Sequence, residues 1–214
     1  MDVDPATRGP TVDTITVADA PLVWREVGFD VEDDGRCQIG TVMLQLLPGK
    51  FPRGLAGWSV RGLSTADIDG LPTESSDAPP RDPAPPHPNG VVAIDHVVVF
   101  TADRMRTVGA LEGAGLEVRR LRDEATPAGG GYQAFFRLGE VILEVIEQKA
   151  SSPQARLWGL SFTVESLEPA TALLGDRLSE PRDAVQPGRR IATLRRSAGV
   201  GVPIAFMTPG PGAA

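Results

Sequence analysis

The sequence contains one cysteine, few aromatic residues and no long apolar run, and each shortage excludes a class of protein. The single thiol of Cys37 cannot form an internal disulfide, which fits a reducing compartment such as the cytoplasm. No stretch approaches the roughly 18 apolar residues of a membrane-spanning helix. The opening MDVDPATRGP is acidic and lacks the apolar core of a secretory signal. We therefore expect a cytoplasmic protein with no membrane partner.

Positive charge is also in short supply. The chain has 21 Lys and Arg residues against 28 Asp and Glu residues, which gives a formal net charge of −7. This surplus of negative charge repels nucleic acid and acidic membrane surfaces, so we expect neither as a partner. The apolar fraction of 41% is enough for an ordinary globular core. The length fits one large domain or two small ones, and it leaves a homodimer open.

Proline is abundant in one stretch, residues 74–90, which follows a first folded segment at 12–73. Dense proline removes amide donors and holds the backbone extended, so we expect this stretch to be a semi-rigid linker. His87 stands there between prolines, and we expect its side chain to be solvated. Residues 91–209 then form the second and larger domain.

The larger domain shows the order strand, helix, strand, strand, strand twice over. Its first copy begins with VVAIDHVVVFTAD, continues through a helix near 103–114, and ends in GYQAFFRLGEVILEVIE. The second copy begins with LWGLSFTVES, continues through a helix near 167–178, and ends in VPIAFMTP. The N-terminal segment repeats this order in shorter form. It has a strand TVDTITV, a short helix that we expect Asp19 to cap, and three short strands in FDVEDDGRCQIGTVMLQLL.

Two polar residues interrupt apolar strands and are the best candidates for a site. His96 and Val98 share one face of their strand, and Glu144 lies between Ile142 and Ile146 on one face of another. A carboxylate among apolar side chains costs several kcal/mol when it is unpaired, so it needs either a partner or a function.

Structural roles for both residues remain open. Glu144 can form an ion pair with Arg137 or Arg195 instead of serving a site. His96 can be a core residue whose ring nitrogens meet the backbone or Asp95. The sequence alone does not decide between these roles and a ligand-facing position.

The segments DHVVVFTAD, GAGLEV, VILEVIE and WGLSFTVES, in this order, resemble the vicinal oxygen chelate superfamily. That superfamily includes glyoxalase I, bleomycin-resistance proteins, extradiol dioxygenases and methylmalonyl-CoA epimerase. The resemblance implies an α+β fold of paired βαβββ modules whose curved, mostly antiparallel sheets surround a cleft. It covers residues 91–209 as one paired-module domain, and residues 12–73 look like a shortened N-terminal module.

The resemblance also implies a place for a metal. In the superfamily a divalent ion is typically held by one residue from the first strand and one from the last strand of each module. His96 and Glu144 match these positions in the first module, whereas Gly159 and Phe206 stand there in the second. Gly57 takes the place of Gly159 in the N-terminal segment. Only half of a metal site is present, so we expect no firmly bound cofactor and at most a weakly bound divalent metal.

Two functions fit this pattern. The first is binding of a small organic molecule in the cleft without a reaction, as in bleomycin-resistance proteins. The alternative is a metal-dependent lyase, isomerase or dioxygenase that acts on a small carbonyl or aromatic compound. In that case His96 and Glu144 would be metal ligands, or without a metal they would act as proton donor and acceptor. We expect Tyr132, Phe135 and Phe206 to line the pocket. The missing second-module ligands favour binding.

Overall fold

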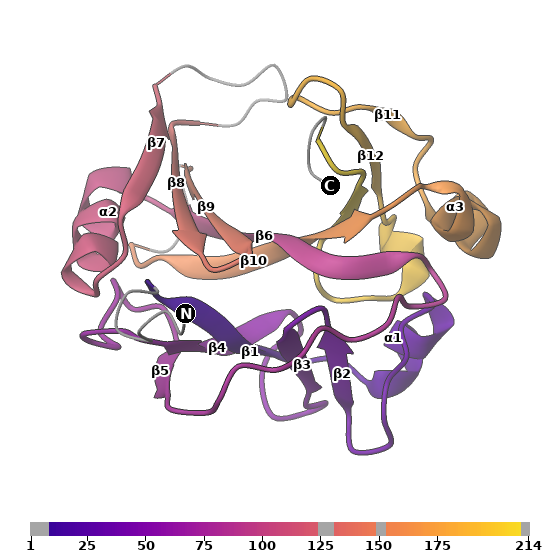
Figure 1. Ribbon diagram of the computed structural model, residues 1–214, viewed down its shortest axis with the longest axis horizontal. Coiled ribbons are helices and arrows are strands. Elements are labelled where there is room, and N and C mark those ends of the chain that lie inside the picture. The colour runs from indigo at the N-terminus through magenta and orange to yellow at the C-terminus, as the bar shows by residue number, and fades with distance from the viewer. Residues whose placement is uncertain (1–8, 124–130, 149–152, 211–214) are drawn as a thin grey trace, which may run out of the picture. The chain divides into compact units, whose positions relative to one another are not determined.

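The computed structural model describes residues 9–123, 131–148 and 153–210 (Figure 1). Within these residues the helices are α1 (Pro21–Glu26), α2 (Arg104–Gly113) and α3 (Glu168–Leu174), with 3-10 turns η2 (Gly175–Arg177) and η3 (Arg196–Ala198). The strands are β1 (Thr11–Val17), β2 (Arg36–Ile39), β3 (Val42–Leu46), β4 (Leu55–Arg61), β5 (Thr73–Ser76), β6 (Val91–Thr101), β7 (Val118–Arg122), β8 (Gln133–Leu138), β9 (Val141–Glu147), β10 (Arg156–Val164), β11 (Arg182–Asp183), β12 (Arg190–Thr193) and β13 (Ile204–Met207). None of the described helices is long and apolar enough to cross a membrane.

The strands form two sheets, in the orders β2-β3-β1-β4-β5 and β11-β12-β13-β10-β6-β9-β8-β7. The runs β6-α2-β7-β8-β9 and β10-α3-β11-β12-β13 both follow the βαβββ plan. In each run the first strand pairs in parallel with the last, and the later strands pair antiparallel. The predicted α+β fold of paired βαβββ modules is confirmed.

The N-terminal segment follows the βαβββ plan only in shortened form. The run β1-α1-β2-β3 has one strand fewer than the plan, because residues 29–31 do not form the strand expected there. Strands β4 and β5 pair in parallel, as the first and last strands of a module do. The backbone amide of Trp58 on β4 donates to the carbonyl oxygen of Pro72 at 3.0 Å, and that of Leu160 on β10 donates to Pro203, also at 3.0 Å.

Gly57 precedes the first of these amide donors and Gly159 precedes the second, and the reason is steric in both cases. A Cβ atom on Gly57 would lie 3.1 Å from the Pro72 carbonyl oxygen, and one on Gly159 would lie 3.0 Å from the Pro203 carbonyl oxygen. At both places a neighbouring backbone approaches too closely for a side chain to fit without a shift. This shared geometry supports the sequence match between Gly57 and Gly159.

The chain divides into two compact units, each described here by itself. Unit 1 comprises Met1–Thr14, Gly57–Pro79 and His96–Trp158, and unit 2 comprises Ile15–Ala56, Pro80–Asp95 and Gly159–Ala214. Each unit contains residues that precede the proline-rich stretch and residues that follow it. The boundaries at 12–73, 74–90 and 91–209 stay predictions. Residues 74–76 belong to β5, whereas residues 77–90 contain neither helix nor strand.

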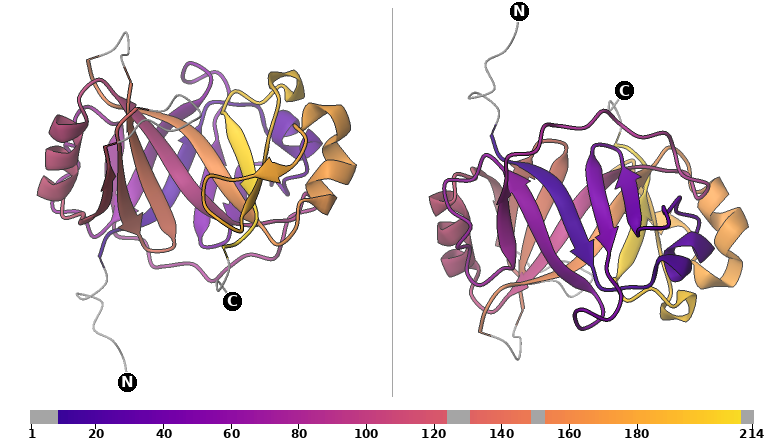
Figure 2. Two further views of the ribbon diagram at one scale, coloured as in Figure 1. Left: turned by 90° about the horizontal axis from the view of Figure 1, so that it is seen from above. Right: turned by 90° about the horizontal axis from the view of Figure 1, so that it is seen from below.

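In unit 1, helix α2 lies beside β8 and β9 (Figure 2). Its N-cap is Asp103, whose carboxylate accepts a hydrogen bond from the Arg106 amide at 3.0 Å. The Glu147 carboxylate accepts from the Arg104 amide at 3.1 Å, so two acidic side chains satisfy free amides of the first turn.

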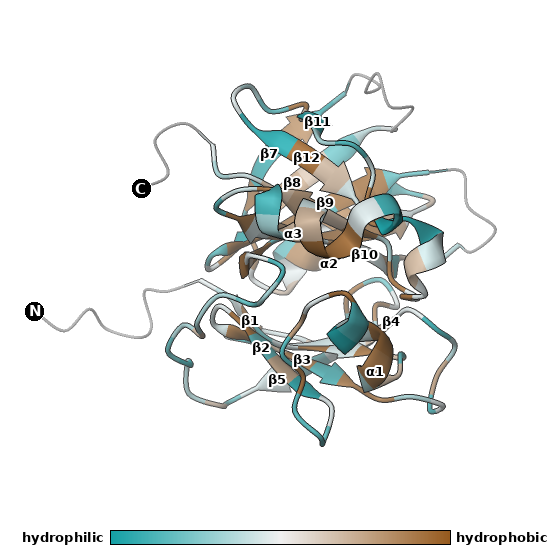
Figure 3. Ribbon diagram, turned by 90° about the vertical axis from the view of Figure 1, so that its right-hand side faces the viewer, coloured by the Kyte–Doolittle hydropathy of each residue, from teal (hydrophilic) through white to brown (hydrophobic). Residues whose placement is uncertain are grey.

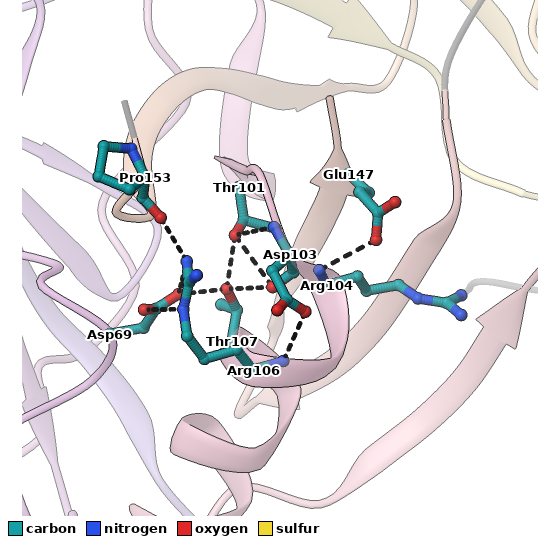
Figure 4. A network of polar contacts seen from close by, with 8 residues as sticks. All are labelled: Asp69, Thr101, Asp103, Arg104, Arg106, Thr107, Glu147 and Pro153. Carbon is teal, nitrogen blue, oxygen red and sulfur yellow. Dashed lines mark hydrogen bonds and ion pairs between the residues drawn. The ribbon is translucent and has the colours of Figure 1, made fainter. Parts of the chain in front are cut away.

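Asp69 connects the N-terminal part of unit 1 to α2 (Figure 4). Its carboxylate accepts from Arg106 Nε at 2.6 Å and Nη2 at 3.1 Å, and from the Thr107 hydroxyl. Its φ of 49° lies in the left-handed region, which non-glycine residues adopt only when the surroundings fix them. The contacts with α2 explain how Asp69 is held there.

In unit 2, the first helix anchors the aromatic core. Trp24 is the buried residue of α1, and the rings of Trp24 and Phe162 both pack on Phe29, with centroids at 5.0 and 5.1 Å. Figure 3 shows α1 with both hydrophobic and hydrophilic parts. Asp19 does not cap this helix as expected: the N-cap is Ala20, which makes no side-chain bond. The buried Asp19 carboxylate instead accepts from the Trp24 indole at 3.2 Å, from Arg53 at 3.0 Å and from the Gly201 amide at 2.7 Å.

The expectation of a solvated His87 is wrong, because this side chain is 6% exposed. Its Nδ1 accepts a hydrogen bond from the Asp30 amide at 3.1 Å, and its Nε2 donates to the Gln38 carbonyl oxygen at 3.1 Å. Burial lowers the pKa of His87, so the imidazole is neutral in this setting. The flanking prolines hold the stretch extended, and His87 fastens it to unit 2.

Candidate functional site

His96 and Glu144 lie on one face of the sheet in unit 1. In the parallel pairing of β6 with β9, His96 is opposite Ile142 and Val98 is opposite Glu144. Paired residues point to the same side of a sheet, and residues two apart on a strand do so as well. His96 and Glu144 therefore lie on neighbouring strands and on the same side of the sheet. Their positions are offset by two residues along the strands.

The alternation VILEVIE shows which side of β9 is less buried, although on the neighbouring β6 the residues of that side, His96, Val98 and Phe100, are buried. Val141, Leu143 and Val145 are buried, whereas Ile142, Glu144 and Ile146 are half-buried. The burial of every second residue is the pattern of a strand with one face in the core. We call the other side the Glu144 face; its members are His96, Val98 and Phe100 from β6, Ile142, Glu144 and Ile146 from β9, and Gln133 and Phe135 from β8.

A chain of side-chain hydrogen bonds holds Glu144 in place. Gln133 Nε2 donates to Glu144 Oε1 at 2.8 Å, and Arg122 Nη1 donates to Gln133 Oε1 at 3.3 Å. Because Gln133 is buried and bonded at both ends of its amide, it fixes the orientation of the carboxylate. Of the two arginines considered as partners from the sequence, Arg137 donates to the Gly139 carbonyl oxygen at 2.9 Å and Arg195 donates to that of Leu178 at 3.2 Å.

An aromatic pair extends the Glu144 face along β6. The rings of Phe100 and Trp158 stack with centroids 4.4 Å apart and an interplanar angle of 27°. The exposed Arg156 guanidinium lies 5.2 Å from the centroid of the Phe100 ring, within reach of a cation–π contact. The sequence shows Trp158 near the start of a module, but no pattern in it pairs this residue with Phe100.

Of the three residues expected to line the pocket, only Phe135 lies on the Glu144 face, directly opposite Glu144 in the register. Gln133 pairs with Ile146, so the preceding Tyr132 points to the other side, where Arg104 lies 5.4 Å from its ring. That tyrosine is 48% exposed.

Phe206 is a core residue of unit 2. It is 0% exposed, and its ring lies 6.3 Å from that of Phe162, its partner in the register of β10 with β13. In the second module Leu160 pairs with Ile204, and in the first module Val97 pairs with Leu143. Ala205 follows Ile204 as Glu144 follows Leu143, so Ala205 takes the place of Glu144 in the second module. The sequence comparison that put Phe206 there is displaced by one residue, which moves a side chain to the opposite face.

The residues present do not fit a tightly held metal ion. At the corresponding positions of the second module, Gly159 has no side chain and Ala205 has only a methyl group, so neither position can supply a side-chain ligand. Among the described residues, no group of three or more His, Cys, Asp or Glu side chains could hold a metal. First-row metals in proteins usually take three or four protein donors.

Comparisons with known proteins give weak matches in structure and none in sequence. No family model matches the chain, and no curated protein matches it. Methylmalonyl-CoA epimerase from Mycobacterium tuberculosis overlaps with a TM-score of 0.48 at 17% identity, over 57% of this chain and 91% of that one. A Streptomyces coelicolor methylmalonyl-CoA epimerase variant in complex with 2-nitronate-propionyl-CoA overlaps with a TM-score of 0.47 at 20% identity, over 56% and 96%.

A hypothetical protein from Bacillus halodurans overlaps with a TM-score of 0.44 at 19% identity, over 56% of this chain and 96% of that one. Identities and TM-scores this low do not assign the chain to a family. The fold class follows from the strand order and register.

Proposed function

We propose that this chain is a protein of the vicinal oxygen chelate type that binds a small organic molecule on the Glu144 face. Glu144 is the polar anchor, and Phe135 and the Phe100–Trp158 pair supply the aromatic surface. The ligand in this proposal has a hydrogen-bond donor, such as a hydroxyl, amide or ammonium group, attached to an apolar or aromatic body.

The observation that carries the proposal is the half-buried Glu144 carboxylate oriented by Gln133 at 2.8 Å. Small-molecule sites typically combine a mostly apolar lining with a few placed polar groups. The Glu144 face has this composition, since valine, isoleucine and phenylalanine side chains surround one oriented carboxylate and one imidazole. In this proposal the carboxylate binds a hydrogen-bond donor on the ligand, and the apolar side chains around it contact the body of the ligand.

A metal-dependent lyase, isomerase or dioxygenase remains the alternative. Its support is that His96 and Glu144 share a face, while the donor set argues against a firmly held ion. Elemental analysis of protein purified without a histidine tag distinguishes a metal-free binding protein from a metal-dependent enzyme. We expect less than one equivalent of zinc, nickel or iron after dialysis; about one equivalent that resists dialysis would support the metal enzyme.

A ligand screen tests the binding function. Wild type and Glu144→Gln are screened by thermal shift against small aromatic and carbonyl compounds, and hits are confirmed by calorimetry. Glutamine keeps an oxygen to accept the Gln133 amide but loses the charge, so the melting temperature should barely change. Loss of a charge-assisted hydrogen bond of about 1.5–3 kcal/mol should weaken binding by roughly 10- to 150-fold.

Glu140→Gln is the matched control, because Glu140 is exposed in the turn between β8 and β9. It should bind hits as wild type does. The proposal fails if Glu144→Gln binds every hit with wild-type affinity, or if it loses binding only because the protein has lost stability.

A further inference from the structure

Unit 2 contains a second candidate site, a groove beyond the end of α1. Its volume is about 690 Å³, within the range of small-molecule sites. Phe29 and Val31 lie along it, Leu173 reaches it from α3, and Pro85 and Pro88 come from the proline-rich stretch. We call it the α1-exit groove.

The apolar walls of the α1-exit groove are firmly packed. Phe29 is 2% exposed and lies against the rings of Trp24 and Phe162. Leu173 is 43% exposed yet packs over Gly28, where an added Cβ atom would lie 2.3 Å from Leu173 Cδ2. An apolar ligand body would therefore meet a fixed wall and cover leucine surface that now faces water.

The charges at the groove favour a cation. The Arg25 guanidinium is bound to Asp33 at 3.0 Å and to the Val31 carbonyl oxygen at 2.9 Å. The exposed Asp30 carboxylate faces His87 Nδ1 at 3.9 Å, and that nitrogen already accepts the Asp30 amide. Because this imidazole is neutral, it does not balance the charge of Asp30.

Glu32 adds a second carboxylate, which is paired with Arg36 at 2.9 Å. Burial first, and then the charges of Asp30 and Glu32, raise the pKa of Cys37 to about 12.

We propose that the α1-exit groove binds a small organic cation, with its ammonium group at the Asp30 carboxylate and its apolar body between Leu173 and the proline side chains. Charge complementarity selects the ammonium, and the packed walls select a compact hydrocarbon or aromatic body. This site is separate from the Glu144 face, which belongs to unit 1, so either proposal can fail alone.

Three probes of one shape test the proposal: benzylammonium, benzyl alcohol and benzoate. Each is titrated into the full-length protein while the methyl resonances of Leu173 and Val31 are followed by NMR. Benzylammonium should shift these signals saturably, benzyl alcohol should bind about tenfold more weakly, and benzoate should leave them unchanged.

Asp30→Asn should reduce the affinity for benzylammonium about tenfold, while Asp176→Asn, a change at an exposed carboxylate on η2, should leave it unchanged. The backbone amide that bonds to His87 is kept in Asp30→Asn, so the fold is preserved. Equal affinity for the charged and neutral probes, wild-type affinity in Asp30→Asn, or saturable shifts confined to other parts of the chain would each overturn the proposal.

Discussion

Buried polar side chains determine much of this protein's behaviour at the residue scale. Asp19, His87 and Gln133 each form at least two hydrogen bonds to groups that are 11 or more residues away in the sequence. Removing one partner leaves other buried groups without a hydrogen bond, which costs more than the bond itself contributes. These residues should therefore be more sensitive to substitution than exposed residues of the same type.

Asp19 provides a stability test of this view. Asp19→Ala deprives the Trp24 indole and the Gly201 amide of their acceptor and leaves Arg53 without its ion pair. We expect a loss of about 2–4 kcal/mol in the free energy of unfolding, measured by urea denaturation. Asp33→Ala, at a fully exposed carboxylate, should change it by less than about 0.5 kcal/mol. Similar losses for both variants would contradict the assigned role of Asp19.

His87 should make stability depend on pH. Burial lowers its pKa in the folded state, while in the unfolded chain it stays near 6.5. Below about pH 6.5 the unfolded state therefore binds more protons, and stability falls as the pH falls.

We expect His87→Asn to be less stable than wild type at pH 7.5 by about 1 kcal/mol, because it keeps an acceptor for the Asp30 amide but loses the donor to Gln38. The gap between the two proteins should narrow at pH 5.5, measured by urea unfolding at both pH values. A gap that stays constant would mean that His87 does not titrate differently in the two states.

At the element scale, sequence periodicity predicted most of the strands and helices. Alternation in VILEVIE predicted β9, and the helices expected near 103–114 and 167–178 are observed at Arg104–Gly113 and Glu168–Leu174. These elements depend on local patterns, which a single sequence displays.

Long-range packing explains what the sequence did not reveal. Phe206 was aligned one residue away from its true register, because apolar residues occupy both faces of β13 near its end. The burial of His87 depends on Asp30 and Gln38, and the orientation of Glu144 depends on Gln133 and Arg122. No periodic pattern encodes such pairs, since they form only when strands and loops come together.

The repeated strand pair offers an element-scale prediction. Gly57→Ala and Gly159→Ala each place a methyl group about as close to a carbonyl oxygen, 3.1 Å and 3.0 Å before any relaxation. We expect both to lower the free energy of unfolding by about 1–3 kcal/mol in urea titrations, because the strands must shift apart. Gly109→Ala, where nothing lies within 4 Å, should be neutral or stabilising. If only one of the two strand variants is destabilised, the two sites are not equivalent.

At the scale of the whole molecule, each compact unit includes chain from both sides of the proline-rich stretch. In unit 1 Asp69 binds Arg106 on α2, and in unit 2 Trp24 and Phe29 pack on Phe162. A fragment of residues 91–214 lacks the N-terminal partner in every one of these contacts.

We therefore expect the 91–214 fragment to aggregate or to melt without cooperativity. Size-exclusion chromatography and circular dichroism melting are the measurements, with the full chain as the reference. A monomeric fragment that melts cooperatively near the temperature of the full chain would instead support 91–209 as an independent domain.

The three tryptophans allow the most direct measurement of ligand binding on the Glu144 face. The Trp24 indole is bonded to Asp19, the Trp58 indole is bonded to Thr73, and Trp158 stacks on Phe100. Their indole N–H signals, assigned with single Trp→Phe variants, are followed by NMR while a confirmed ligand is titrated. We predict that the Trp158 signal shifts saturably in wild type and in Glu140→Gln but not in Glu144→Gln, while Trp24 and Trp58 stay in place. Tight binding that shifts only Trp24 or Trp58 would contradict the proposed site.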